Sequence, residues 1–209
     1  MEHRIDVAAA RLPGWLTRFG ERHPETVMDI VDTSVLVQAP DGATARITAW
    51  PSQPPAEVEA LQDWVAGPAQ IGLILVRRGG WSVGVAREAE LTAHRTGRRY
   101  VQSRTAAGGW SQQRFARRRG NQADALVGHV AEAVATMLPA DAGGVVLGGD
   151  RALAAAVLDD LPAHTGQPAL RDLPRREFYD LPDPRLTVLR TALARARSAQ
   201  ICVDDPTRG

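Results

Sequence analysis

A long helix whose two halves differ in character is the strongest constraint on how this 209-residue chain can fold. Apolar residues recur at helical spacing over its second half, at Ala123, Leu126, Val127, Val130, Val134, Met137 and Leu138. The spacing predicts a helix from about residue 112 to residue 138, in which the apolar stripe begins only after a run of arginines. We therefore expect the first turns to project away from the hydrophobic core and the later turns to anchor the helix to it.

Strands and helices alternate around this helix. Residues 71–76 form a continuous apolar run rich in β-branched side chains, which is typical of a buried strand. The remaining elements expected here are a strand at 81–85, an alternating strand at 98–105, a buried strand at 144–147, a helix at 151–158 capped by Asp150, and a last helix starting at Asp183-Pro184. The alternation predicts the α/β fold class, with a mixed sheet flanked by helices.

A proline-rich break, Pro51-Ser52-Gln53-Pro54-Pro55, divides the chain, because prolines at this density favour an extended connector. Before it, helical spacing at 8–22 and short strands at 27–31, 34–38 and 44–49 predict a small α+β subdomain. The expected organisation is an N-terminal α+β subdomain at 1–50, a connector with a short helix at 51–68, an α/β catalytic domain at 69–203, and a flexible tail at 204–209.

Positive charge is concentrated in one segment, although the net charge is only +1. No Asp or Glu occurs from Leu91 to Ala123, and this segment contains Arg95, Arg98, Arg99, Arg104, Arg114, Arg117, Arg118 and Arg119. A solvated surface is the alternative interpretation, but such surfaces usually interleave both signs. The pattern favours a polyanion as the partner, and nucleic acid in particular.

Between the basic strand and the basic helix lies an uncharged tip that contains Gly108, Gly109 and Trp110. Two adjacent glycines permit positive φ and let the backbone approach a ligand closely, and a tryptophan can stack on a base. The amides of Gln112 and Gln113 can donate and accept hydrogen bonds at neutral pH. Because nothing in the tip titrates near pH 7, any chemistry there must come from positioning and polar stabilisation.

Other chemistries are less well supported by the sequence. The glycines at 143–149 match neither a P-loop nor a dinucleotide fingerprint, and they indicate a turn between strand and helix. The five histidines are scattered, so no metal and no cofactor is expected. The single cysteine, Cys202, excludes an intramolecular disulfide, and the chain lacks an N-terminal signal-like run and a membrane-length apolar span. The cytoplasm is the expected compartment.

The segment from Gly108 to Arg117 resembles the catalytic loop of eukaryotic and archaeal peptide-chain release factors, in which Gly-Gly-Gln is followed at the same spacing by Arg-Phe-Ala-Arg. Trp110 occupies the place of the release-factor glutamine. The segment is more similar to a release-factor-like family that cleaves peptidyl-tRNA on stalled, split ribosomes. That family includes the eukaryotic ribosome-quality-control hydrolases and actinobacterial members. Its Gly-x-x-Gln is matched by Gly109-Trp110-Ser111-Gln112, and the whole chain looks like an actinobacterial member.

The resemblance implies roles for individual residues. Gln112 would be the catalytic glutamine, with Gln113 as the rival candidate, and Gly108 and Gly109 would let the tip reach the peptidyl-transferase centre. The residues implied to contact RNA are Trp110, Arg98, Arg99, Arg104, Arg114, Arg117, Arg118 and Arg119. The implied fold is that of the catalytic domain of eukaryotic and archaeal release factors.

The implied activity is codon-independent hydrolysis of the peptidyl-tRNA ester on stalled ribosomes or 50S subunits. No stop-codon-reading domain is evident, because the segment before Pro51 is too short for one. The expected partners are the large ribosomal subunit with its 23S rRNA and peptidyl-tRNA, with neither DNA nor membrane, and the protein is expected to be monomeric. Two other classes remain open: a non-catalytic ribosome- or RNA-binding module, and, with less support, a metal-dependent nuclease.

Overall fold

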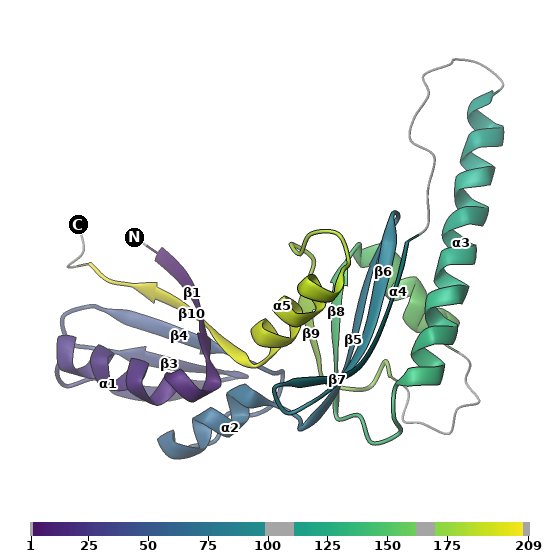
Figure 1. The fold of residues 1–209 in the computed structure, drawn as a ribbon. Coiled ribbons are helices and arrows are strands. Elements are labelled where there is room, and N and C mark those ends of the chain that lie inside the picture. Colours follow the sequence, from purple (N-terminus) through teal and green to yellow (C-terminus); the bar gives the residue numbers. More distant parts are fainter. Residues whose placement is uncertain (1, 99–110, 162–169, 207–209) are drawn as a thin grey trace. The chain divides into compact units, whose positions relative to one another are not determined.

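The computed structural model describes residues 2–98, 111–161 and 170–206, and for residues 111–121 it describes only the helix backbone. The chain divides into two compact units (Figure 1). One comprises Met1–Ala69 together with Ala194–Gly209, and the other comprises Gln70–Leu193.

The first unit contains an antiparallel sheet with the strand order β1-β10-β4-β3-β2. Its strands are β1 (Glu2–Ala8), β2 (Val27–Val31), β3 (Ser34–Gln38), β4 (Thr44–Thr48) and β10 (Ser198–Asp204). Its helical segments are η1 (Ala9–Arg11), α1 (Leu12–Arg22), η2 (Val58–Ala60) and α2 (Leu61–Ala66). Leu12 and Phe19 of α1 pack in one core with Val35 and Ile47 of the sheet, as the helical spacing of the N-terminal segment predicts.

The C-terminal strand β10 (Ser198–Asp204) was not predicted from the sequence. Residues 198–203 were expected within the catalytic domain, whereas β10 lies between β1 and β4 in the first unit.

Asp204 and Asp205 were expected in a flexible tail, but Asp204 ends β10 and Asp205 is buried. The carboxylate of Asp205 lies 3.7 Å from Nε2 of His23, whose Nδ1 is 2.7 Å from Asp41. Residues 207–209 lie outside the described part of the chain.

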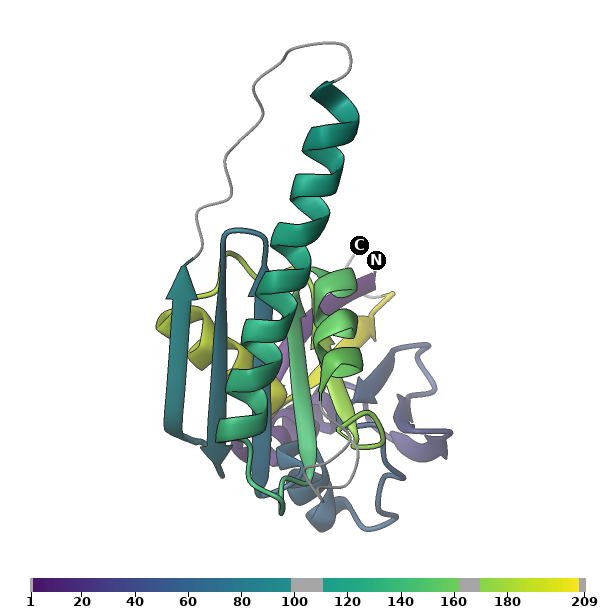
Figure 2. The ribbon, with the colours of Figure 1, turned by 90° about the vertical axis from the view of Figure 1, so that its right-hand side faces the viewer.

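The second unit is built on a mixed sheet with the strand order β7-β6-β5-β8-β9. Its strands are β5 (Gln70–Arg77), β6 (Gly80–Arg87), β7 (Glu90–Arg98), β8 (Gly144–Gly149) and β9 (Arg175–Phe178). The first three form an antiparallel meander, and β8 runs parallel to both β5 and β9. Helices α3 (Ser111–Met137) and α4 (Arg151–Asp160) cover one face, and α5 (Leu186–Ala196) lies on the other (Figure 2). The predicted α/β fold class with a mixed sheet is confirmed.

Two local predictions in this unit hold. Every residue of 71–76 is buried in β5, as the continuous apolar run indicates. Asp150 caps α4, because its side chain accepts hydrogen bonds from the backbone N–H groups of Ala152 and Leu153, at 3.0 and 3.1 Å.

The strand predicted at 98–105 lies outside the described residues except for Arg98, and the strand that the structure describes before it was not predicted. In the structure β7 spans Glu90–Arg98, and residues 99–105 lie outside the described part of the chain. Side chains 92–96 of β7 are exposed on both faces of the sheet, so this sequence has no alternation of apolar and polar residues.

Candidate functional site

Helix α3 is anchored to the sheet through its second half. Leu126, Val130 and Val134 are fully buried among the strands and α4. Leu138, just past the end of the helix, packs so closely on Gly72 of β5 that a Cβ atom at residue 72 would come within 2.4 Å of it. The carboxyl end of α3 therefore lies at the start of β5. Toward its amino end, the helix follows the sheet to the turn between β5 and β6.

The first half of α3 extends beyond the sheet. Among the helix side chains that the structure describes, from 122 onward, Leu126 is the first that is buried. With a rise of 1.5 Å per residue, Ser111 lies about 22 Å from Leu126 along the helix axis. Figures 1 and 2 show this part of the helix continuing past the end of the strands. The arrangement agrees with the expectation of an anchored second half and a projecting first half.

The proposed catalytic and RNA-binding residues fall into three groups. Gly108, Gly109, Trp110, Arg99 and Arg104 lie outside the described residues. The residues placed by backbone alone, in the first turns of α3, are Gln112, Gln113, Arg114, Arg117, Arg118 and Arg119. Arg98 is the one member of the set whose side chain is described: it is exposed at the end of β7 and pairs with Gly80.

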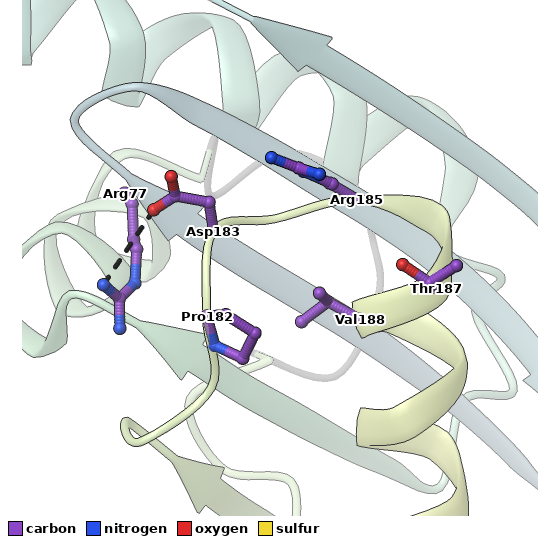
Figure 3. A pocket seen from close by; sticks show the side chains of 6 residues that line it. All are labelled: Arg77, Pro182, Asp183, Arg185, Thr187 and Val188. Atoms are coloured by element: carbon purple, nitrogen blue, oxygen red, sulfur yellow. Dashed lines mark ion pairs between the residues drawn. The ribbon is translucent and has the colours of Figure 1, made fainter.

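A second group of arginines, which the sequence prediction did not include, lies at the same end of the sheet. Arg77 and Arg185 line an open pocket of about 530 Å³ together with Pro182, Asp183, Thr187 and Val188 (Figure 3). Arg77 ends β5, and Arg78 follows it in the turn to β6. The signal in the sequence was the Arg77-Arg78 pair, which was interpreted only as part of a hairpin turn.

Nearby, Arg151 at the start of α4 is held by other groups. Its guanidinium lies 4.2 Å from the centre of the Tyr179 ring and 3.1 Å from Glu177. Burial, followed by the charge of Glu177, raises the pKa of the Tyr179 hydroxyl above its ordinary value. Arg151 is therefore engaged in a local ion pair and a cation–π contact.

Metal and membrane sites are not found among the described residues. No three His, Cys, Asp or Glu side chains in the described part of the chain converge to hold a metal ion. Likewise, none of the described helices is long and apolar enough to cross a lipid bilayer.

Residues 69–202 match a family model of release factors. The chain belongs to the family that this model describes, the Actinobacteria/chloroflexi VLRF1 release factors. The membership predicted from the loop residues is thus confirmed, and it connects the chain to translation. No curated protein matches the sequence significantly.

Solved structures with some similarity include an archaeal translation termination factor, aRF1, at 14% identity and a TM-score of 0.39. That match covers 82% of this chain and 50% of the archaeal chain. A second, described only as an archaeal protein, has 16% identity and a TM-score of 0.32, covering 74% of this chain and 48% of its own. The chain thus spans about half the length of the structures it matches.

Proposed function

We propose that this protein hydrolyses the ester bond between a nascent peptide and tRNA on stalled ribosomes or 50S subunits, independently of the codon. One observation carries the proposal. In a chain of a release-factor family, Leu126 is the first buried residue among the described side chains of α3, and the helix backbone carries Gln112 and the following arginines past the end of the sheet (Figure 2). A projecting polar and cationic helix start suits insertion into a site made of RNA.

The chemistry follows from groups that stay neutral at pH 7. The amide of Gln112, or backbone N–H groups of the loop, would hold a water molecule beside the ester carbonyl and stabilise the oxyanion that forms. The water oxygen bonds to the carbonyl carbon, the bond to the tRNA 3′-oxygen breaks, and that oxygen takes up the proton of the water with help from neighbouring ribose and RNA groups. An amide is too weak a base to deprotonate water, so Gln112 acts by positioning and polar stabilisation.

The remaining residues of the segment would place the loop. Gly108 and Gly109 allow close approach of the backbone. Trp110 would stack on a base, and the arginines would bind phosphates of 23S rRNA or of the tRNA acceptor stem. Trp110 stands where termination factors carry their glutamine, which supports rescue of stalled ribosomes rather than termination at a stop codon. The protein would act as a monomer on cytoplasmic ribosomes.

A release assay on defined complexes tests the proposal. Purified 50S subunits and 70S ribosomes, each carrying peptidyl-tRNA, would be mixed with the protein, the 70S complexes with either a stop codon or a sense codon in the A site. We expect release of the peptide, with no dependence on the codon. Binding to these complexes without release would instead support the second candidate, a non-catalytic ribosome-binding module that uses the same basic segment.

A further inference from the structure

Two arginines lie on either side of a glycine, on three neighbouring strands. Gly80 of β6 pairs with Arg77 of β5 on one side and with Arg98 of β7 on the other. Residues directly opposite each other in antiparallel strands point to the same face of the sheet. Gly80 is buried and has no side chain, so no side chain of β6 stands between Arg77 and Arg98. The centres of β5 and β7 lie about 10 Å apart.

The face that carries these arginines is the one covered by α5. The guanidinium of Arg77 donates a hydrogen bond from Nη2 to the carbonyl oxygen of Leu181, at 2.5 Å, in the segment that leads to α5. Arg185, exposed just before α5, lines the same pocket as Arg77 (Figure 3). With Arg78 exposed in the turn between β5 and β6, four arginines lie at one end of the sheet. We call Arg77, Arg78, Arg98 and Arg185 the arginine rung.

Arg77 is oriented by this hydrogen bond, and its ion pair with Asp183 is long and exposed to solvent. Its Nη1 lies 4.0 Å from Oδ1 of Asp183, which is too far for a hydrogen bond, and Asp183 is 75% exposed. Among the six residues that line the pocket, Arg77 and Arg185 are positively charged and Asp183 is the one carboxylate, so this lining keeps an excess of positive charge. A guanidinium that is already held by a backbone carbonyl loses little further freedom when it binds a phosphate. Arg151, which is engaged by Glu177 and Tyr179, differs in this respect.

We propose that the arginine rung is a second RNA-binding surface. It binds the phosphate backbone of ribosomal RNA beside the place where the proposed catalytic loop enters the peptidyl-transferase centre. The inference rests on the proposed function, since that function makes RNA the partner. RNA is favoured over an acidic protein because α3 extends past the same end of the sheet (Figure 2) and carries an acid-free basic segment there. A polyanion can contact both surfaces at once, and phosphate contacts of this kind set the orientation of a bound protein.

Binding to vacant 50S subunits tests the surface without requiring any hydrolysis. The double variant Arg78→Glu/Arg185→Glu reverses two exposed charges of the arginine rung and leaves the hydrogen bond of Arg77 in place. The control, Arg18→Glu/Arg190→Glu, makes the same change of charge at exposed positions of α1 and α5. Dissociation constants would be measured for both variants and the wild type at salt concentrations from about 50 to 200 mM, and thermal unfolding would check that both fold.

We expect the rung variant to bind about tenfold or more weakly than the control, and its plot of log affinity against log salt to lose about 0.9 of slope per phosphate contact removed. Equal affinity and slope for the two variants would overturn the proposal. A second probe, deproteinised 23S rRNA, identifies the partner: weakened binding to 50S subunits with unchanged binding to the RNA alone would assign the surface to a ribosomal protein and reject RNA. If the wild type releases no peptide but the rung variant still loses affinity, the proposed hydrolysis fails and the RNA-binding surface stands.

Discussion

The indole of Trp81 lies so close to Gly97 on the neighbouring strand that a Cβ atom at residue 97 would come within 2.3 Å of the indole nitrogen. The same indole packs edge-on against His129 of α3, with ring centroids 5.4 Å apart and the ring planes at 74°. Gly97 is the penultimate residue of β7, and α3 begins at Ser111. A single side chain therefore contacts both elements that border the segment 99–110, where the proposed catalytic loop lies.

Replacing Gly97 by alanine should disturb this contact. The added methyl group must displace Trp81, and overpacking of this kind costs about 1 to 3 kcal/mol of unfolding free energy. Urea unfolding would measure the loss. Gly79→Ala is the matched control, since a Cβ atom there meets nothing within 4 Å. We also expect the Gly97 variant to release peptide more slowly than the control under conditions where both are folded, and equal stability of the two would contradict the role given to Trp81.

The two glutamines at the start of α3 can be separated by single substitutions. Loss of one oxyanion or positioning contact raises a barrier by about 3 kcal/mol, so Gln112→Ala should slow peptide release roughly a hundredfold. Gln113→Ala should retain most of the rate. Single-turnover release from 50S complexes carrying peptidyl-tRNA is the measurement. The opposite order of effects would transfer the role to Gln113.

The arginines that follow the glutamines should make binding dependent on salt. Each phosphate contact adds about 0.9 to the slope of log affinity against log salt. Arg117→Ala/Arg118→Ala should therefore lower the slope for 50S subunits by up to about 2 and weaken binding most at low salt. Arg18→Ala/Arg22→Ala, which removes two exposed arginines of α1, is the control. A wild-type affinity that does not change with salt would argue against phosphate contacts altogether.

Stability at acid pH should depend on Asp41. The hydrogen bond from His23, followed by that from the backbone N–H of Ala43, lowers the pKa of the Asp41 carboxyl from its ordinary 3.8. Because this pKa is lower in the folded than in the unfolded protein, the carboxylate stabilises the fold above pH 3.8, and this stabilisation is lost as the pH falls through the folded value.

Asp41→Asn should accordingly lower the urea midpoint near pH 7, and the difference from wild type should shrink as the pH falls below 3.8. The control is Asp29→Asn, which removes an exposed carboxylate of β2 in the same unit. A difference between Asp41→Asn and wild type that stays constant over this range would show that the contribution of Asp41 is not one of charge.

Local patterns in the sequence predicted the helices and strands that bury one face or both faces in the hydrophobic core. The apolar repeat located α3 nearly to the residue, and the continuous apolar run located β5, because burial imposes a periodicity that a single segment reveals. The strands β7 and β9 were not predicted. Side chains 92–96 of β7 are exposed, and β9 is only Arg175–Phe178, so neither carries such a signal.

Pairings between distant segments could not be predicted. The place of β10 beside β1 depends on contacts between the two ends of the chain, which no local pattern encodes. The arginine rung has the same origin. Arg77 and Arg98 were both visible in the sequence, but only the register of three strands brings them to either side of Gly80. The loop residues, by contrast, are contiguous, and this is why they could be recognised without a structure.

The position of β10 between β1 and β4 also bears on how a cell makes this protein. The ribosome synthesises β10 after every other strand that the structure describes. The strand β1 therefore lacks its hydrogen-bonding partner while most of the chain is synthesised. By contrast, all the described strands of the second unit have been synthesised before β10 leaves the ribosome. A nascent chain interrupted before β10 would therefore leave the edges of β1 and β4 that pair with β10 unpaired, and such strand edges are prone to aggregation.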